Sequence, residues 1–191
     1  MTRLASWTAL AAAAVLAGCA AVPPPAATPR APAFDLIGRV SVSSAGRVFS
    51  SHLRWAHGSS RDEIWLMTPM GQALARITGD AGGATLSGSD GSELEADDIE
   101  SLMRRALGWE LPVARLAWWV QGGIVPAGVI GEVVRDGEGR LVRLRQDGWR
   151  IELAHPPAGG RDPRPGRVAL AEDQLRIRIV IDRWREAPDQ P

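Results

Sequence analysis

From Phe34 onward, hydrophobic and polar side chains alternate along a series of short segments. A period of two places neighbouring side chains on opposite faces of a strand, so each segment predicts a strand with one buried face. Turns rich in glycine and aspartate separate the segments, and a strong hairpin signal stands at Asp90-Gly91. The predicted strands are 34–43, 49–55, 63–67, 72–78, 84–87, 132–135, 141–146, 149–153, 168–170 and 175–182.

Between residues 97 and 123 the hydrophobic period changes to that of an α-helix. Asp97-Asp98 supply a cap for a first helix, and Gly108 is suited to its end. Pro112 opens a second short helix, because proline is favoured in the first helical turn. The apolar stripe of the first helix is Ile99, Leu102, Met103, Ala106 and Leu107, and that of the second is Val113, Leu116, Ala117 and Val120.

About ten antiparallel strands with grouped helices predict an α+β fold, in which one strongly curved sheet or open barrel carries the helices on one face or at its mouth. If the helices cover the hollow side, the interior can hold a long apolar ligand. The residues that we expect in the core or in the cavity wall are Leu53, Trp55, Leu66, Trp149, Ile151, Ile177 and Ile179, with Leu175 and Ile181 in the same row as the last two.

The first residues are typical of an export signal. Arg3 precedes an uncharged stretch that ends at Leu16, which is too short to span a bilayer that needs about 20 residues. Leu16-Ala17-Gly18-Cys19 resembles the bacterial lipobox, in which the cysteine is acylated and becomes the first residue of the mature chain. We therefore expect residues 1–18 to be a lipoprotein signal peptide and Cys19 to be the lipid attachment site. The alternative is an ordinary secretory signal with an incidental cysteine.

Residues 20–33 contain five prolines and cannot form a helix or a central strand. We expect residues 19–33 to be the acylated cysteine and a Pro-rich tether that contributes no core, residues 34–185 to be the folded domain, and residues 186–191 to be a disordered tail. Asp after the lipidated cysteine is the usual inner-membrane retention signal in Gram-negative lipoproteins. The residue there is Ala20, which favours export to the outer membrane.

Composition and charge remove several functional classes. The chain has 22 basic and 22 acidic side chains and a formal net charge of zero, which argues against a nucleic-acid binder. One cysteine excludes a disulfide framework, and the three histidines do not have the spacing of a metal site. Nucleophile-elbow, dinucleotide-binding and Walker motifs are absent from the sequence. An enzyme is therefore possible, but no motif in the sequence supports one.

The turn at Pro69-Met70-Gly71 places an apolar residue where a polar one is usual. Proline at the second position and glycine at the fourth suit a tight type I turn, which puts Met70 at the tip. Two interpretations are open on spacing alone. Met70 folds back into the core as a gap-filler, or it forms an exposed tip that enters lipid.

In order along the chain, these features resemble the LolB family of outer-membrane lipoprotein receptors. The resemblance covers residues 34–184, together with the lipobox at Cys19. It rests mainly on Phe34-Asp35-Leu36-Ile37-Gly38-Arg39-Val40, Leu53-Arg54-Trp55, Thr68-Pro69-Met70-Gly71-Gln72, Asp97-Asp98, Gly108, Leu111-Pro112, Trp118 or Trp119 with Gly122, Gln146-Asp147-Gly148-Trp149 and Ile181-Asp182-Arg183-Trp184.

The resemblance implies an incomplete antiparallel barrel with a helical lid over an apolar cavity, a fold shared with the soluble carrier LolA. The implied function is to accept lipoproteins from LolA and to insert them into the inner leaflet of the outer membrane, as a lipid-anchored monomer that faces the periplasm. The resemblance also implies that the protein uses no nucleotide, metal or other cofactor and is not an enzyme. In the family a protruding leucine on the Pro-Leu-Gly turn is important for lipid delivery, and Met70 stands at that position here. The alternatives are a hydrolase tethered as a lipoprotein and a structural or assembly lipoprotein.

Overall fold

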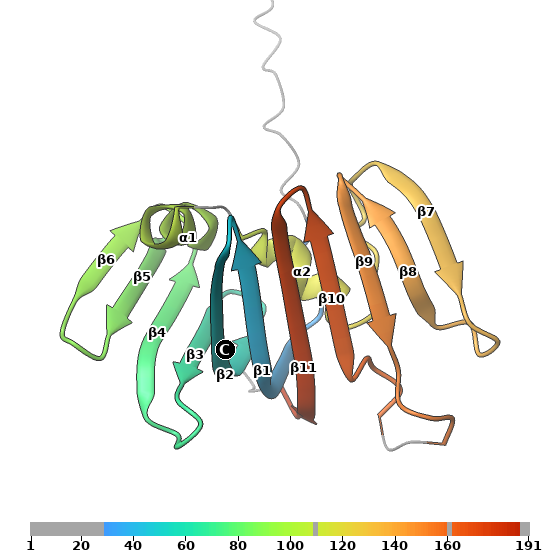
Figure 1. Ribbon diagram of the computed structural model, residues 1–191, viewed down its shortest axis with the longest axis horizontal. Helices are drawn as coiled ribbons and strands as arrows, with labels where there is room; N and C mark the ends of the chain where they lie inside the picture. The colour runs from blue at the N-terminus through green and yellow to red at the C-terminus, as the bar shows by residue number, and fades with distance from the viewer. Residues whose placement is uncertain (1–28, 109–110, 160–161, 188–191) are drawn as a thin grey trace, which may run out of the picture.

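The computed structural model describes residues 29–108, 111–159 and 162–187, which form one curved sheet with two short helices (Figure 1). The predicted signal peptide, Cys19, residues 20–28 of the predicted tether and residues 188–191 of the predicted tail lie outside the described residues. The strands are β1 (Phe34–Ser44), β2 (Arg47–His57), β3 (Asp62–Met67), β4 (Ala73–Asp80), β5 (Gly83–Gly88), β6 (Glu93–Ala96), β7 (Ile130–Arg135), β8 (Leu141–Gln146), β9 (Trp149–Ala154), β10 (Arg167–Glu172) and β11 (Leu175–Arg185).

The eleven strands form a single sheet in the order β6-β5-β4-β3-β2-β1-β11-β10-β9-β8-β7, and every neighbouring pair is antiparallel. The first and last strands pair at the centre, while β6 and β7 stand at the two edges (Figure 1). The sheet is therefore open, and the α+β prediction of a strongly curved antiparallel sheet is confirmed. Ten of the strands match the predicted segments, and β6 is the additional one.

The contact between β1 and β11 depends on a glycine. The register of the pair shifts between Ile37 and Gly38, where Gly38 lies opposite Ile181. A Cβ atom at Gly38 would overlap the carbonyl oxygen of Val180, so only glycine allows the two backbones to approach at this point. An extra residue in a ladder generally increases the local bend and twist, and this one lies in the central pair of the sheet.

Two helices, α1 (Ile99–Leu107) and α2 (Val113–Trp119), lie where the change of period predicts them. The Asp98 side chain accepts a hydrogen bond of 2.6 Å from the backbone N–H of Ser101, which confirms the cap. Gly108 ends α1 in the left-handed conformation, with φ of 81°. In Figure 1, α2 lies behind the central strands and α1 lies beside β4, β5 and β6, with which it makes its contacts. No helix among the described residues is long and apolar enough to cross a membrane.

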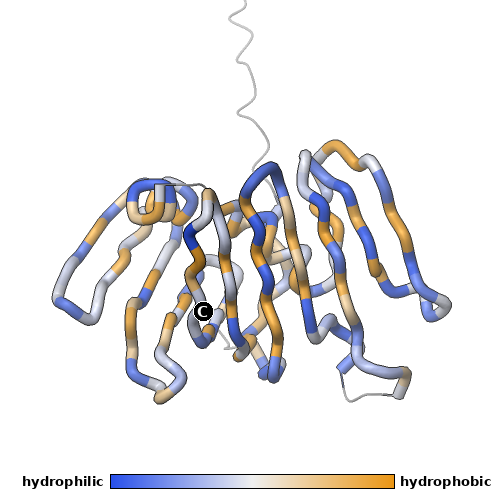
Figure 2. Tube along the Cα trace, viewed as in Figure 1, coloured by the Kyte–Doolittle hydropathy of each residue, from blue (hydrophilic) through white to orange (hydrophobic). Residues whose placement is uncertain are grey.

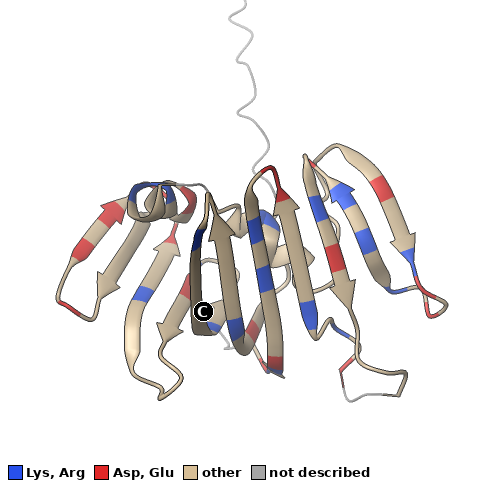
Figure 3. Cartoon of the chain, viewed as in Figure 1, with Lys and Arg blue, Asp and Glu red and all other residues tan. Residues whose placement is uncertain are grey.

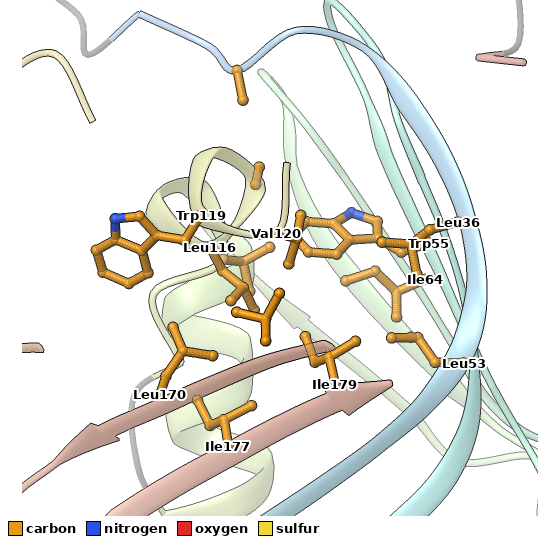
Figure 4. Packing of buried hydrophobic residues seen from close by; sticks show 14 of the residues in the cluster. Leu36, Leu53, Trp55, Ile64, Leu116, Trp119, Val120, Leu170, Ile177 and Ile179 are labelled. Carbon is orange, nitrogen blue, oxygen red and sulfur yellow. The ribbon is translucent and has the colours of Figure 1, made fainter. Parts of the chain in front are cut away.

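The alternation of apolar and polar side chains along the strands places the apolar ones in the core. Orange and blue segments follow one another along the strands in Figure 2, as expected for strands with one buried face. In Figure 4, Leu116 and Val120 lie between side chains from the two halves of the sheet, with Leu170 and Ile177 on one side and Trp55 on the other. The second helix therefore packs against the centre of the concave face, between the two halves of the sheet.

The half of the sheet formed by β8 to β11 is closed by tight packing. The rings of Trp119 and Trp149 lie 5.9 Å apart, and both side chains are buried. Gln146, which is only 1% exposed, accepts hydrogen bonds from the Trp119 indole N–H and from the Val125 N–H. Its amide also donates to the Val125 carbonyl at 2.8 Å. These bonds satisfy the buried polar groups and fix α2 and its following loop against β8.

Residues 29–33 differ from the expectation of a free tether. Ala31 is buried in the core cluster, and the Ala31 carbonyl faces the His57 ring at 3.2 Å. The carbonyls of Pro29 and Pro32 accept hydrogen bonds from Trp118 and Gln121. Proline has no backbone N–H, so this segment offers few hydrogen-bond donors, but its carbonyl groups can still accept. The donors come from side chains of α2 and of the residues that follow it. The packed part of the chain thus includes Pro29, and we refer to residues 29–33 as the strap.

Candidate functional site

A cavity of about 330 Å³ lies between the first five strands and the two helices. This volume falls at the lower end of the range of about 300–1,000 Å³ that is usual for ligand pockets. Every residue that lines the cavity is apolar. The lining residues are Val40, Val42, Phe49, Leu53, Trp55, Ile64, Leu66, Leu74, Ala75, Ile77, Leu86, Met103, Leu107, Leu111, Val113 and Leu116.

The strand register explains why these side chains meet. Leu53 of β2 lies opposite Leu66 of β3, which lies opposite Ala75 of β4. A second row lies two residues further along the same face. In this row Trp55 of β2 lies opposite Ile64 of β3. Ile77 of β4 lies opposite both Ile64 and Leu86 of β5. Residues that are opposite each other in a ladder share a face, so the concave face becomes a continuous apolar wall.

The helices form the other side of the cavity. Met103 and Leu107 come from α1, Val113 and Leu116 come from α2, and Leu111 lies between the two helices. Glu100 of α1 accepts a hydrogen bond from the Ala114 N–H at 2.9 Å, which joins the two helices at their N-terminal ends. The pair therefore covers the cavity as a lid.

The cavity opens to solvent through apolar residues. Phe49, Leu74 and Leu107 line it, and they are 40%, 37% and 36% exposed. Large apolar side chains that remain partly exposed around an opening are typical of a binding site for apolar ligands or surfaces. The arrangement suits an elongated apolar ligand that enters at this mouth.

The chemistry of the wall is uniform. No titratable side chain lines the cavity, and the described residues hold no group of three or more His, Cys, Asp or Glu side chains that could bind a metal ion. A charged or strongly polar ligand would lose its hydration in the cavity without gaining a hydrogen-bond partner. The wall is therefore chemically better suited to hydrocarbon than to a polar ligand.

The structure places the seven expected wall residues in two groups. Leu53, Trp55 and Leu66 line the cavity. The other four are buried in the packed half of the sheet and do not line it: Trp149, Ile151, Ile177 and Ile179. The reason is physical, since the paired indoles of Trp119 and Trp149 fill the second half of the hollow. Most of the other residues that line the cavity lie in segments whose hydrophobic period predicts a buried face. The hydrophobic period alone does not distinguish a residue that lines a cavity from one that is packed in the core.

The Pro69-Met70-Gly71 turn joins β3 to β4. The Gly71 N–H donates to the Thr68 carbonyl at 2.9 Å, and Gly71 has a φ of 82°, which favours glycine. The Met70 side chain is 88% exposed, so it does not fold back into the core. The turn is followed closely by Leu74 at the cavity mouth, which places an exposed apolar tip next to the opening.

A buried polar cluster holds the strap against the domain, and sequence reasoning did not identify it. The Asp62 carboxylate accepts hydrogen bonds from the Trp55 indole N–H at 2.8 Å and from Arg30 at 2.6 Å, and it faces the His57 ring at 2.6 Å. Burial acts to raise the pKa of Asp62, but the hydrogen bonds from His57 and Trp55 and the charge of Arg30 outweigh it. The pKa of Asp62 therefore lies below its ordinary value.

Comparison with known proteins gives a consistent result. A family model described as outer membrane lipoprotein LolB matches residues 32–184. The outer-membrane lipoprotein LolB of Thiobacillus denitrificans is 41% identical over 192 residues, which span 98% of this chain and 100% of that protein. The LolB protein of Chromobacterium violaceum is 36% identical over 176 residues, or 90% of this chain and 93% of that protein.

Among solved structures, a LolA superfamily protein from Nitrosomonas europaea aligns over 83% of this chain and 88% of its own length, with a TM-score of 0.46 and 7% identity. The match of the family model and the identity to curated relatives extend over most of the sequence and over all of the cavity-forming segments. The chain belongs to the LolB family of outer-membrane lipoproteins.

Proposed function

We propose that the protein accepts acylated lipoproteins from the soluble periplasmic carrier LolA and transfers them to the inner leaflet of the outer membrane. Membership of the LolB family supports a role in lipoprotein sorting. The observation that carries the finer proposal is the cavity, which is walled only by apolar side chains and open at an apolar mouth. Such a site suits an acyl chain and offers nothing to a polar substrate.

The energetics favour a carrier that uses no cofactor. Each buried methylene of an acyl chain contributes about 0.8 kcal/mol, so a triacylated protein cannot cross water unaided. Transfer from one apolar site to another that binds the acyl chains more tightly needs no other energy source. A difference of about 1.4 kcal/mol in binding free energy already corresponds to a tenfold difference in affinity. A receptor held at the target membrane then gives the transfer its direction.

The test is a transfer assay with the full mature protein. A triacylated lipoprotein bound to the soluble carrier is mixed with this protein, and the complexes are separated before and after liposomes are added. We expect the lipoprotein to move to this protein and then to the liposomes. If the client stays on the carrier while the carrier itself remains competent for release, the proposed function is wrong.

Lipid anchoring gives a separate prediction. We expect Cys19→Ala to abolish acylation and to leave the domain folded, because the printed sequence places the cysteine ten positions before Pro29, the first residue of the strap. Only nine residues, 20–28, separate the two, so an extended tether reaches about 30 Å. Metabolic labelling with a palmitate analogue measures the effect. Label that persists on the variant would show that Cys19 is not the attachment site.

Met70→Glu should separate acceptance from release. The exposed side chain contributes little to stability, so we expect the free energy of unfolding to change by less than about 0.5 kcal/mol. Acceptance of a lipoprotein should be unchanged, whereas insertion into liposomes should slow several-fold, because a carboxylate at the tip cannot enter the hydrocarbon edge.

Two further variants control this experiment. Met70→Leu keeps an apolar tip and should insert lipoproteins as fast as the unchanged protein. Gln72→Glu adds the same charge beside the tip, on a residue that is also exposed, and should have a smaller effect. Loss of acceptance together with release, or unfolding of Met70→Glu by several kcal/mol, would show that Met70 belongs to the cavity or core.

A further inference from the structure

The convex face of the sheet carries a second hollow, of about 580 Å³, which faces away from the lipid cavity. Arg150, Arg176 and Arg178 line it, together with the small residues Ala169 and Ala171. We refer to this site as the arginine hollow. In Figure 3 the basic residues form bands across β8, β9 and β11, whereas β6 carries acidic ones.

The register of the strands builds the hollow. Arg176 of β11 lies between Ala171 and Ser43, and Arg178 lies between Ala169 and Ser41. Small side chains therefore flank each arginine on both sides and leave room around its guanidinium group. Arg178 is exposed, as are Arg150 and Arg176, so all three groups are free to meet a ligand.

These arginines lack the partners that their neighbours have. Arg39 pairs with Asp182, and Arg143 pairs with Glu132. Among the described residues, no carboxylate forms an ion pair with Arg150, Arg176 or Arg178, although Glu152 also lines the hollow. Arg145 lies directly opposite Arg150, and like charges at such positions destabilise a sheet. An anion bound to the hollow would remove this repulsion.

A second depression lies between the arginine hollow and the Pro69-Met70-Gly71 turn. It is smaller, about 220 Å³, and is lined by Pro69, Arg39 and Arg178, so Arg178 borders both this depression and the arginine hollow. Val48 also lines the arginine hollow and is 72% exposed. Exposed apolar residues beside cationic ones are the pattern of a surface that lies against a membrane, with apolar groups in the lipid and arginines at the headgroups.

We propose that the arginine hollow binds the phosphate groups of anionic phospholipid headgroups while Met70 and Val48 contact the acyl region. The inference rests on the proposed function, because the anchor keeps the domain within about 30 Å of a lipid surface. The guanidinium group is suited to phosphate, which it binds through two parallel hydrogen bonds.

The consequence is orientation. Val48 of the hollow is followed in β2 by Phe49 at the cavity mouth. Headgroup binding by Arg176 and Arg178 would therefore hold the mouth close to the bilayer, and an acyl chain would leave the cavity without crossing bulk water. This surface would act only in release and would leave acceptance of the client unchanged.

The test measures vesicle binding by the full mature chain carrying Cys19→Ala, so that the protein's own acyl chains do not mask the interaction. Vesicles contain phosphatidylcholine alone or phosphatidylcholine mixed with phosphatidylglycerol. We expect binding to the mixed vesicles only. The pair Arg176→Gln and Arg178→Gln should weaken it roughly 25-fold, because each basic residue near an anionic surface contributes about fivefold. The matched control is the pair Arg61→Gln and Arg183→Gln, which removes the same charge from exposed positions at the opposite ends of the strands and should weaken binding less than about threefold.

Several outcomes would contradict the binding of lipid headgroups by the arginine hollow. Equal weakening by the two pairs would overturn the proposal in favour of general charge attraction, and no weakening by the Arg176 and Arg178 pair would remove the hollow from the membrane contact. Loss of client transfer from the carrier with unchanged vesicle binding would assign the hollow to a protein partner instead. If the double variant does not fold, each single variant should show about fivefold weaker binding. Binding of a fatty-acid probe to the cavity is measured in parallel, because its failure would contradict the proposed function itself.

Discussion

Leu66→Glu is expected to weaken the binding of an acyl chain at least about a hundredfold and to leave the domain folded. Leu66 lies between Leu53 and Ala75 on the cavity wall and is only partly buried, so a carboxylate stays hydrated while the cavity is empty. When an acyl chain enters, that carboxylate must give up its water without gaining a partner, or take up a proton. Displacement of a fluorescent fatty-acid probe measures the loss of affinity.

Two variants control for the substitution itself. Leu66→Met keeps the wall apolar at nearly the same volume and should bind within about threefold of the unchanged protein. Ser87→Glu adds a carboxylate to an exposed position on β5, next to Leu86 but on the other face of the strand, and should have no effect. Unchanged probe affinity for Leu66→Glu would mean that acyl chains bind elsewhere.

Asp62→Ala is expected to lower the free energy of unfolding by about 3 kcal/mol, because each buried donor left without its acceptor costs about 1–3 kcal/mol. The substitution leaves the His57 ring and the Trp55 indole N–H without their acceptor and releases Arg30 of the strap. Urea unfolding measures the change. Asp182→Ala breaks an exposed pair with Arg39 and should cost less than about 1 kcal/mol. Equal effects of the two variants would contradict the structural role of Asp62.

The same cluster predicts a pH dependence. The folded protein holds the pKa of Asp62 below its ordinary value, so the folded state favours the ionised carboxyl more than the unfolded chain does. The resulting stabilisation is complete above the unfolded pKa of about 3.9 and is lost as the pH falls through the lower folded value. Stability should therefore decline below about pH 4, and Asp62→Asn should flatten that part of the curve. If the stability of the variant has an unchanged dependence on pH, other carboxyl groups control the loss of stability at low pH.

Local pattern predicted most elements of the fold. Alternation located ten of the strands, and the apolar stripe with the Asp98 cap located α1. Strand order was harder to derive, because the pairing of β1 with β11 joins segments more than 130 residues apart. The pairing also needs a glycine at Gly38, where the two backbones leave no room for a side chain, and local spacing does not reveal that requirement.

The site was predicted only in part for a similar reason. Period two assigns a side chain to the concave face but does not reveal whether that face is filled. Leu53 and Ile151 have equivalent patterns, yet Leu53 lines the cavity, whereas Ile151 is fully buried in the half of the sheet that contains the paired indoles of Trp119 and Trp149. The strap was missed because proline predicts extended chain, whereas the packing of Ala31 depends on donors from distant residues.

The most direct test of the account is to locate the client's acyl chain by cross-linking. A triacylated lipoprotein with a photo-reactive acyl chain is loaded on the soluble carrier, transferred to this protein and irradiated before liposomes are added. We expect cross-links on the wall segments of β1 to β5, α1 and α2, around residues such as Leu53, Leu66 and Leu116. Cross-links confined to the convex face, or none while the carrier itself is labelled, would contradict this expectation.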